Sequence, residues 1–304
     1  MASVVVSRAF HGCHSRSTDG FFFNDTATTE TLQFDDLSPY LLLKNGNYLY
    51  KVPFRDDWAV LKVYYGSRGT VGNLYKSFEN VVFAGQTSYM PKTRLRIERE
   101  CLETWRKHGF RVYDIYPEVE VVAPNCPPGG YMLFEYKTGP KLNQYLADST
   151  IDLEQRFSAY RRFLDEWGRR HEIAIREQDP RLVHENGDGK HVLIFDEELL
   201  WFDFEMIWRS RRRVDEQIGH EIVQYLWNIS KNIPEELRER LLEETIEHYP
   251  SRDRLAAAPG FFLDHPRLLH RWGRQLDQNL RSRARKPTSK YNVARRLQEK
   301  LEVR

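Results

Sequence analysis

Four polar residues that could support acid–base or metal chemistry lie close together in one loop. They are His184, Asn186, Asp188 and His191, and Asp203 follows at the end of an apolar run. A buried acid in such a run is costly unless it is paired or bound to a metal. An acid directly after an apolar strand is a suitable Mg²⁺ ligand, and histidine can bind a metal through one ring nitrogen. This stretch is therefore the candidate site.

A strand–turn–strand element is needed to position these residues. Residues 192–194 form a short apolar run, residues 196–198 are acidic and suit a turn, and residues 199–202 form a second apolar run. The pattern predicts two short adjacent strands, with the polar loop before them and Asp203 after them. We therefore expect Asp203 to lie close to His191.

This order of loop, strand, turn and acid resembles the protein-kinase-like superfamily, whose pattern is H-x-D-x-x-x-x-N, an apolar strand and then D-F-G. His184 matches the first position, and Asp203 with Phe204 matches the last pair. Asn186 stands where the family has its catalytic Asp, and His191 stands where it has a metal-binding Asn. Glu205 replaces the Gly, which resembles the D-F-E form of bacterial lipopolysaccharide core kinases of the Kdo and heptose type.

The preceding half of the chain has features similar to the small lobe of the same superfamily. Residues 40–43, 47–54 and 58–65 are apolar, β-branched runs separated by turn residues, and they predict a three-stranded meander. Lys62 in the third run resembles the Lys of V-A-I-K. The helix predicted over residues 92–108 carries Glu98, with Glu100 as the alternative, as its partner. Glu135 and Tyr136 resemble the hinge. A full G-x-G-x-x-G loop is absent.

The order of elements favours an α+β fold with two lobes. Further strands are predicted at residues 111–122 and 131–136, and the later part of the chain is mostly helical. We expect a kinase-like small lobe over residues 35–136 and a helical lobe over residues 137–304. Helices are predicted at residues 142–146, 153–175, 214–231, 234–248, 266–283 and 293–301.

The resemblance implies transfer of the ATP γ-phosphate to a hydroxyl group, with a sugar or glycolipid of the lipopolysaccharide type as acceptor. Lys62 and Glu98 would anchor the ATP phosphates, and the backbone at Glu135 and Tyr136 would bind the adenine edge. A Mg²⁺ or Mn²⁺ ion would be held by the remaining site residues, which are Asp203, His191 and Glu205.

The catalytic loop leaves the role of general base open. Asn186 cannot accept a proton as an Asp does. Asp188 on its Gly-Asp-Gly turn is the expected base, and Glu185 is the second option. His191 is either a metal ligand or a neutral core histidine. The alternative function is a pseudokinase, which would act as a nucleotide-gated or ATP-free binding module. A third interpretation is an unrelated α+β domain with a D-F-E sequence arising by chance.

Composition and charge limit the other possibilities. The chain has 304 residues, of which 40% are hydrophobic, enough to bury a core. The three cysteines are not spaced as metal ligands, which favours a reducing compartment and a cytoplasmic location. If the basic C-terminus binds lipid, the protein would be peripheral to the inner membrane. Residues 271–304 contain eleven Lys and Arg against three Asp and Glu. This basic tail is a solvated helix face or binds an anionic membrane, whereas sparse aromatic residues there argue against specific nucleic acid.

The N-terminus has an unusual sequence. Residues 21–30 (FFFNDTATTE) resemble the translation of a T-rich run followed by a common sequencing-library adapter, and the match covers seven codons at residues 24–30. A native Thr-rich loop is the alternative. We therefore expect residues 1–34 to be a non-native or disordered N-terminus and exclude residues 1–30 from fold reasoning.

Overall fold

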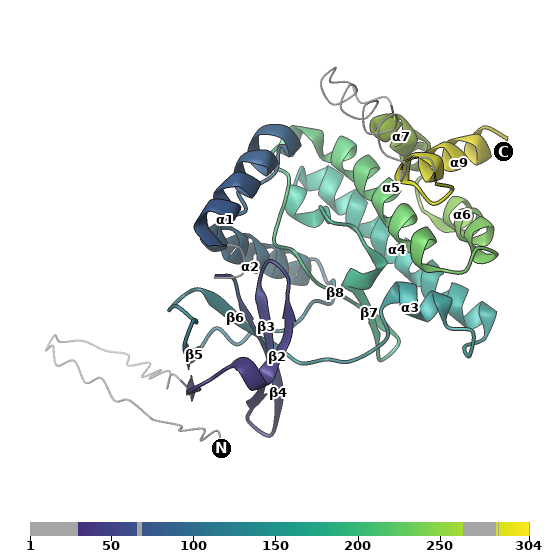
Figure 1. Cartoon of the computed structure of the whole chain (residues 1–304). Coiled ribbons are helices and arrows are strands. Elements are labelled where there is room, and N and C mark those ends of the chain that lie inside the picture. The colour runs from purple at the N-terminus through teal and green to yellow at the C-terminus, as the bar shows by residue number, and fades with distance from the viewer. Residues whose placement is uncertain (1–29, 66–68, 264–283, 285, 304) are drawn as a thin grey trace, which may run out of the picture. The chain divides into compact units, whose positions relative to one another are not determined.

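A computed structural model describes residues 30–65, 69–263, 284 and 286–303 (Figure 1). The chain is an α+β protein with small sheets and a helical body, which confirms the predicted fold class at this level. It divides into two compact units. Unit 1 comprises residues 1–75, 90–95 and 113–136, and unit 2 comprises residues 76–89, 96–112 and 137–304.

The main sheet of unit 1 has four antiparallel strands in the order β2-β3-β4-β6. Their bounds are Leu41–Lys44, Tyr48–Phe54, Asp57–Val63 and Tyr131–Glu135. Alternate side chains of the central strands are buried, as the pleat requires, and Val52, Ala59 and Leu61 are fully buried. The predicted meander and the strand before residue 136 are therefore confirmed.

A second, two-stranded sheet in unit 1 was not predicted. Strand β1 (Glu30–Gln33) pairs in parallel with β5 (Val119–Val122). The strand expected over residues 111–122 is thus wrong in its first half, where Pro117 cannot donate a ladder hydrogen bond. Strand β1 also includes residues that the sequence analysis assigned to a non-native or disordered N-terminus. Leu32 is buried in the core of unit 1, which explains its order.

A buried arginine ties the turn between β2 and β3 to unit 1. The Arg94 guanidinium donates to Asn47 Oδ1 at 2.6 Å, to the Tyr64 carbonyl at 2.9 Å and to the Gly46 carbonyl at 3.2 Å. Gly46 has a φ of 77°, a region that glycine enters at little cost. The Arg94 guanidinium therefore holds this turn through the Gly46 carbonyl and the Asn47 side chain.

Unit 2 is built mainly from helices. In chain order they are α2 (Pro91–Lys107, which begins in unit 1), α3 (Leu142–Ala147), α4 (Leu153–Glu177), α5 (Val214–Asn232), α6 (Leu237–His248), α7 (Arg252–Leu263) and α9 (Lys290–Val303). The Asp152 side chain caps α4 by accepting from two backbone N–H groups of its first turn. Gly109, with a φ of 74°, follows the end of α2, where a left-handed residue commonly ends a helix.

Most predicted helices are confirmed within a few residues at each end. Helix α6 starts three residues later than expected, at Leu237 after Pro234. Helix α7 was missed, since it contains Pro259. Also missed were α1 (Gly69–Phe78) and the π-helix Glu79–Ala84 that continues it, because this stretch is rich in polar residues and Gly. The helix expected at residues 266–283 lies outside the described residues. Across the described part of the chain, we find no helix with the length and apolar character to cross a membrane.

Candidate functional site

The hairpin β7–β8 brings the two ends of the candidate site together within unit 2. Strand β7 (Val192–Phe195) pairs antiparallel with β8 (Glu198–Trp201), and Val192 lies opposite Trp201. Asp196 and Glu197 form the turn with positive φ values of 49° and 62°. At the open end, the Phe202 N–H donates to the His191 carbonyl at 3.1 Å. The register therefore places His191 beside the residues that follow β8.

His191 and Asp203 are in contact, as the sequence predicts. The Nε2 atom of His191 lies 3.2 Å from Oδ2 of Asp203, and Nδ1 lies 3.0 Å from the carbonyl oxygen of Asn186. A carbonyl accepts only, so Nδ1 carries the proton of that bond. In the neutral ring, the Nε2 lone pair then faces the carboxylate. Both Nε2 and Oδ2 are atoms that can ligate a cation.

His184 holds the backbone of Asp203 from the other side. Its Nε2 donates to the Asp203 carbonyl at 3.0 Å, so its Nδ1 accepts from the Tyr225 hydroxyl at 2.7 Å. Burial, with a contribution from nearby His191, lowers the pKa of His184 to about 4. The ring is therefore neutral at pH 7, and its role here is to position Asp203.

Asp203 itself adopts a conformation that costs energy. Its φ is 74°, in the left-handed region where only Gly is at ease, although Asp and Asn tolerate it better than most residues. The next residue, Phe204, is buried with its ring 4.4 Å from the Trp105 ring and 5.3 Å from that of His184. Packing of Phe204 and the His184 bond fix this conformation. Strained residues of this kind cluster at functional sites.

Glu221, a fully buried carboxylate on α5, holds the start of the loop at His184. Glu221 Oε2 accepts the backbone N–H of His184 at 2.9 Å, and Oε1 accepts the Trp167 indole N–H at 3.0 Å. Glu221 also pairs with Arg170 and lies 3.3 Å from His171 Nε2. Although burial opposes ionisation, the Arg170 charge and the histidines hold the pKa of Glu221 at about 2. Sequence reasoning missed Glu221 and Arg170, because only the fold brings them to the loop.

The guanidinium of Arg170 lies against two tryptophans. Its Cζ is 4.5 Å from the ring centre of Trp105 and 5.0 Å from that of Trp201. Two of its nitrogens, Nε and Nη1, have no hydrogen-bond partner, so the ring faces take the place of acceptors there. His171, whose pKa burial lowers to about 4, is 2.8 Å from the Tyr249 hydroxyl through Nδ1. Aromatic side chains therefore contact both Arg170 and His171 in this network.

The loop itself is shaped by Gly187 and Asp188. A Cβ on Gly187 would lie 2.6 Å from a ring carbon of Tyr225, so only glycine fits there without displacement. Asp188 caps the 3₁₀ turn Gly189–His191, with Oδ1 accepting the Lys190 N–H at 3.0 Å and Oδ2 lying 3.1 Å from Lys190 Nζ. Both oxygens of the expected base are thus engaged by one neighbour.

The side chain of Asn186 points away from this turn. It is exposed, and its Oδ1 accepts from the Gln224 amide at 3.3 Å. Its backbone carbonyl holds His191, as described above. Asn186 therefore contributes to the site through its main chain.

Glu185 is a carboxylate with altered acidity next to His184. Its Oε1 accepts a hydrogen bond from the side-chain amide of Gln86. An isolated antiparallel β-bridge between Gln86 and Trp208 positions Gln86 in unit 2. Burial, and to a smaller extent the charge of Asp203, raises the pKa of Glu185 to about 7. A carboxylic acid with such a pKa is suited to general acid–base chemistry at neutral pH. The sequence offered Glu185 only as the second option for this role.

The remaining predicted residues lie elsewhere in the two units. Lys62 is buried on β4, opposite Leu49 and Met132 on the neighbouring strands. Glu98 is buried on the part of α2 that belongs to unit 2.

The two hinge candidates are at the end of β6 in unit 1. Glu135 exchanges hydrogen bonds with Asp114, since its N–H donates to the Asp114 carbonyl and its Oε1 accepts the Asp114 N–H. The ring of Tyr136 has Lys51 Nζ 4.2 Å from its centre. The candidate metal ligand Glu205, in unit 2, is partly buried.

His191 and Asp203 offer two donors to a divalent cation. Within residues 30–65, 69–263, 284 and 286–303, no three or more His, Cys, Asp or Glu side chains are grouped to hold a metal, so Glu205 does not complete such a group with them. Two donors suit an ion that is also bound by a substrate phosphate, which is how Mg²⁺ is commonly held. The backbone bond to Nδ1 orients His191 as outer partners orient metal-bound histidines. The pair therefore fits a shared divalent cation.

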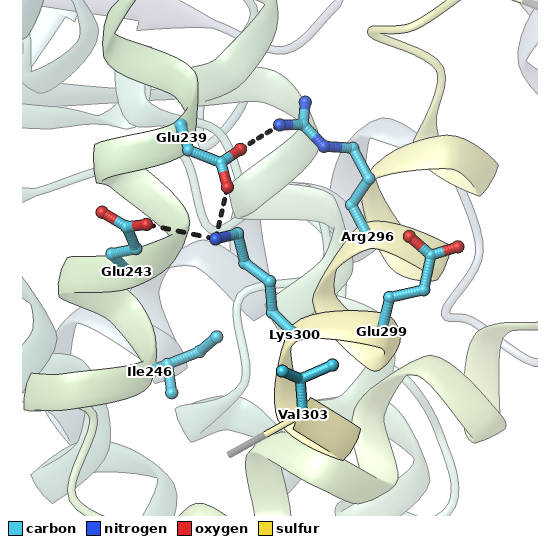
Figure 2. Close-up of a pocket in the computed structure, with 7 residues that line it drawn as sticks. All are labelled: Glu239, Glu243, Ile246, Arg296, Glu299, Lys300 and Val303. Atoms are coloured by element: carbon cyan, nitrogen blue, oxygen red, sulfur yellow. Dashed lines mark hydrogen bonds and ion pairs between the residues drawn. The ribbon is translucent and has the colours of Figure 1, made fainter.

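A separate pocket lies between α6 and α9 (Figure 2). Glu239 pairs with Arg296 and with Lys300, and Lys300 Nζ is also 3.2 Å from Glu243 Oε1. Both bases of the pocket are therefore paired with acids of α6, and Glu299 on α9 adds a third acid.

No protein-family model matches the sequence, and no curated protein shows significant similarity to it.

Proposed function

We propose that this chain is an atypical phosphotransferase of the protein-kinase-like type, which transfers the ATP γ-phosphate to a hydroxyl group. The observation that carries the proposal is the His191–Asp203 pair, 3.2 Å apart at the open end of a hairpin. The Asp203 carboxylate, its strained backbone and the oriented rings of His184 and His191 lie together there. A sugar or glycolipid of the lipopolysaccharide type is the proposed acceptor, from the D-F-E sequence at Asp203.

The two-lobed arrangement and the nucleotide contacts belong to the same proposal. Lys62 and Glu98 would anchor the ATP phosphates, and the main chain at Glu135 and Tyr136 would bind the adenine edge. Burial of both Lys62 and Glu98 supports these roles, because a buried charge requires a partner.

In this proposal, His191 Nε2 and Asp203 Oδ2 would hold Mg²⁺ or Mn²⁺ together with phosphate oxygens. When bound, the ion would neutralise charge on the transferred phosphoryl group. Carboxylate ligands suit both ions, and the imidazole nitrogen favours Mn²⁺ over Mg²⁺ in affinity. His184 keeps the Asp203 main chain in place through the 3.0 Å bond to its carbonyl.

The proton of the acceptor hydroxyl would pass to Glu185. As the hydroxyl oxygen forms its bond to the γ-phosphorus, the bond from that phosphorus to the ADP oxygen breaks, and the hydroxyl proton moves to the Glu185 carboxylate. We prefer Glu185 to Asp188 because both oxygens of Asp188 are occupied by Lys190. Asp188 then serves to shape the loop that carries Asn186 and His191.

A pseudokinase is the second candidate, and one specific observation favours it. Asn186 replaces the acid expected in the loop, and its side chain contacts Gln224. An ATP-binding module without turnover would be compatible with the same His191–Asp203 pair.

Two measurements on the full chain test the proposal. Thermal shift with ATP, with and without Mn²⁺, reports binding, and release of ADP over a panel of sugar and glycolipid acceptors reports transfer. We expect a Mn²⁺-dependent shift and acceptor-dependent ADP release. Binding without turnover on any acceptor would assign the chain to the pseudokinase class. Absence of both would reject a kinase-like function.

A further inference from the structure

One helix of the protein exposes an unusual amount of apolar surface. Helix α1 (Gly69–Phe78) continues directly into the π-helix Glu79–Ala84, and six large apolar side chains on this stretch are more than half exposed. They are Val71, Leu74, Tyr75, Phe78, Val82 and Phe83. Half of the large apolar side chains found exposed among the described residues lie on these sixteen positions. A continuous apolar surface of this kind marks an interaction site more often than it marks a free face.

The exposed aromatic groups form a contiguous patch at the end of the helix. The rings of Phe78 and Phe83 are 6.0 Å apart in an edge-to-face arrangement, although both side chains are about 60% exposed, at 59% and 62%. The charges on this helix cancel, since Lys76 Nζ lies 2.9 Å from Glu79 Oε2. The helix therefore presents a neutral, aromatic surface.

A basic segment is attached to the end of this helix. The Arg209 N–H donates to the Gly85 carbonyl at 3.0 Å, and the Arg209 guanidinium donates to the Val81 carbonyl at 2.8 Å. Gly85 ends the helix with a φ of 67°. The three exposed arginines of the turn Arg211–Arg213 follow two residues later. Arg209 is thus bound to the end of the helix that carries the aromatic patch, and three more arginines follow it closely in the chain before the next acid, Asp215.

From this juxtaposition we infer that the helix at residues 69–84 and the arginines at positions 209 and 211–213 bind the surface of an anionic lipid membrane. Aromatic and aliphatic side chains on an amphipathic helix insert into the headgroup region, and clustered basic residues bind anionic lipids. Charge complementarity selects this occupant over a neutral apolar partner.

This surface differs from the one that the sequence analysis expected. The C-terminal helix α9 carries Arg296 and Lys300, but both pair with acids of α6 (Figure 2). The arginines beside the π-helix are exposed instead. The inference concerns where the protein binds, and it does not depend on the proposed phosphotransfer.

Vesicle co-sedimentation of the full chain tests the inference. Binding is measured to phosphatidylcholine vesicles with and without phosphatidylserine, at low and raised NaCl concentration. We expect binding only when phosphatidylserine is present, and weaker binding as salt screens the arginines. Two variants address the two components separately. Phe78→Ser with Phe83→Ser, and Arg211→Gln with Arg212→Gln and Arg213→Gln, should each lower the bound fraction at least about tenfold.

Matched control variants remove exposed apolar groups or exposed positive charges from other parts of the surface. Leu41→Ser with Leu43→Ser removes exposed apolar groups from β2, and Lys107→Gln with Arg162→Gln and Arg252→Gln removes three exposed charges. Both controls should bind within about twofold of the parent, and far-UV circular dichroism should confirm that every variant is folded.

Three results would overturn the inference. They are no binding of the parent to phosphatidylserine vesicles, equal binding to neutral vesicles, or loss of binding in the controls as large as in the test variants. If the parent does not bind vesicles but self-associates, and Phe78→Ser with Phe83→Ser abolishes that association, the face belongs to a second copy of the chain.

Discussion

The Nε2 atom of His191 lies 3.2 Å from the Oδ2 atom of Asp203, and the other ring nitrogen is bound to the carbonyl of Asn186. The carbonyl bond fixes the tautomer, so the lone pair of a neutral ring points at the carboxylate. Both atoms can ligate a cation, and the proposed phosphotransfer places Mg²⁺ or Mn²⁺ between them.

The first prediction concerns this cation. Asp203→Asn should abolish the Mn²⁺-dependent part of any thermal shift by ATP, because the amide oxygen carries no charge. Asn is the appropriate replacement because it tolerates the φ of 74° at this position, whereas Ala would add strain. The matched control is Asp196→Asn, at the hairpin turn, where φ is also positive at 49°. A Mn²⁺-dependent shift that survives in Asp203→Asn would show that the ion lies elsewhere.

The second prediction separates the two candidate bases. Glu185→Gln should lower phosphotransfer by about 10²-fold or more, as expected for loss of a general base, with ATP affinity little changed. Asp188→Asn should leave turnover within a few-fold, because Asn also caps the turn before Lys190. Initial rates of ADP release, measured at saturating ATP, give the comparison. The opposite pattern would return the role of base to Asp188.

Sequence patterns predicted those parts of the site that are local. The hairpin and the proximity of His191 to Asp203 follow from apolar runs and a turn within twenty residues, and both are confirmed. The pairing of Lys62 with Glu98 stays a prediction.

Residues that contact the site but lie far from it in the sequence could not be found from local patterns. Glu221 lies 37 positions after the His184 N–H that it accepts, and Gln86 lies 99 positions before Glu185. No periodicity marks a buried acid on a helix as a partner of a loop, because its neighbours are set by helix packing. The same holds for the parallel pairing of Glu30–Gln33 with Val119–Val122, which joins segments with no turn between them.

The third prediction uses the raised pKa of Glu185. With a pKa of about 7 in the folded protein and 4.5 when unfolded, the folded state binds more protons between these values. Stability from this group is therefore present below pH 4.5 and is lost as the pH rises towards 7. Glu185→Gln removes the effect while keeping an acceptor for Gln86. The variant should be more stable than the parent by on the order of 2 kcal/mol at pH 8.

Urea unfolding at several pH values from 4.5 to 8 measures this difference directly. The gap in unfolding free energy between Glu185→Gln and the parent should shrink steadily as the pH falls. A constant gap would mean that the Glu185 pKa is close to its ordinary value. Glu103→Gln, at an exposed position on α2, is the control for a change of one charge.

The fourth prediction concerns the buried charge network below the loop. Glu221→Gln leaves the Arg170 guanidinium buried without its counter-charge, and breaking a fully buried pair in this way typically costs about 3 to 5 kcal/mol. Replacing both partners, as Glu221→Gln with Arg170→Met, should recover part of this loss, because the orphaned charge is removed. The unfolding free energies of the two variants and the parent give the test. A double variant less stable than Glu221→Gln alone would show that Arg170 acts mainly through Trp105 and Trp201.

The last prediction follows from the two buried histidines. His171 and His184 each have a pKa of about 4 in the folded protein, whereas an unfolded histidine titrates near 6.5. Between these values the unfolded state binds more protons, so stability is complete above pH 6.5 and is lost as the pH falls towards 4. Each ring contributes on the order of 3 kcal/mol to this loss. His171→Gln should therefore have a shallower decline in unfolding free energy from pH 6.5 to 4 than the parent. A His171→Gln variant with an unchanged slope would show that this ring is already protonated in the folded protein.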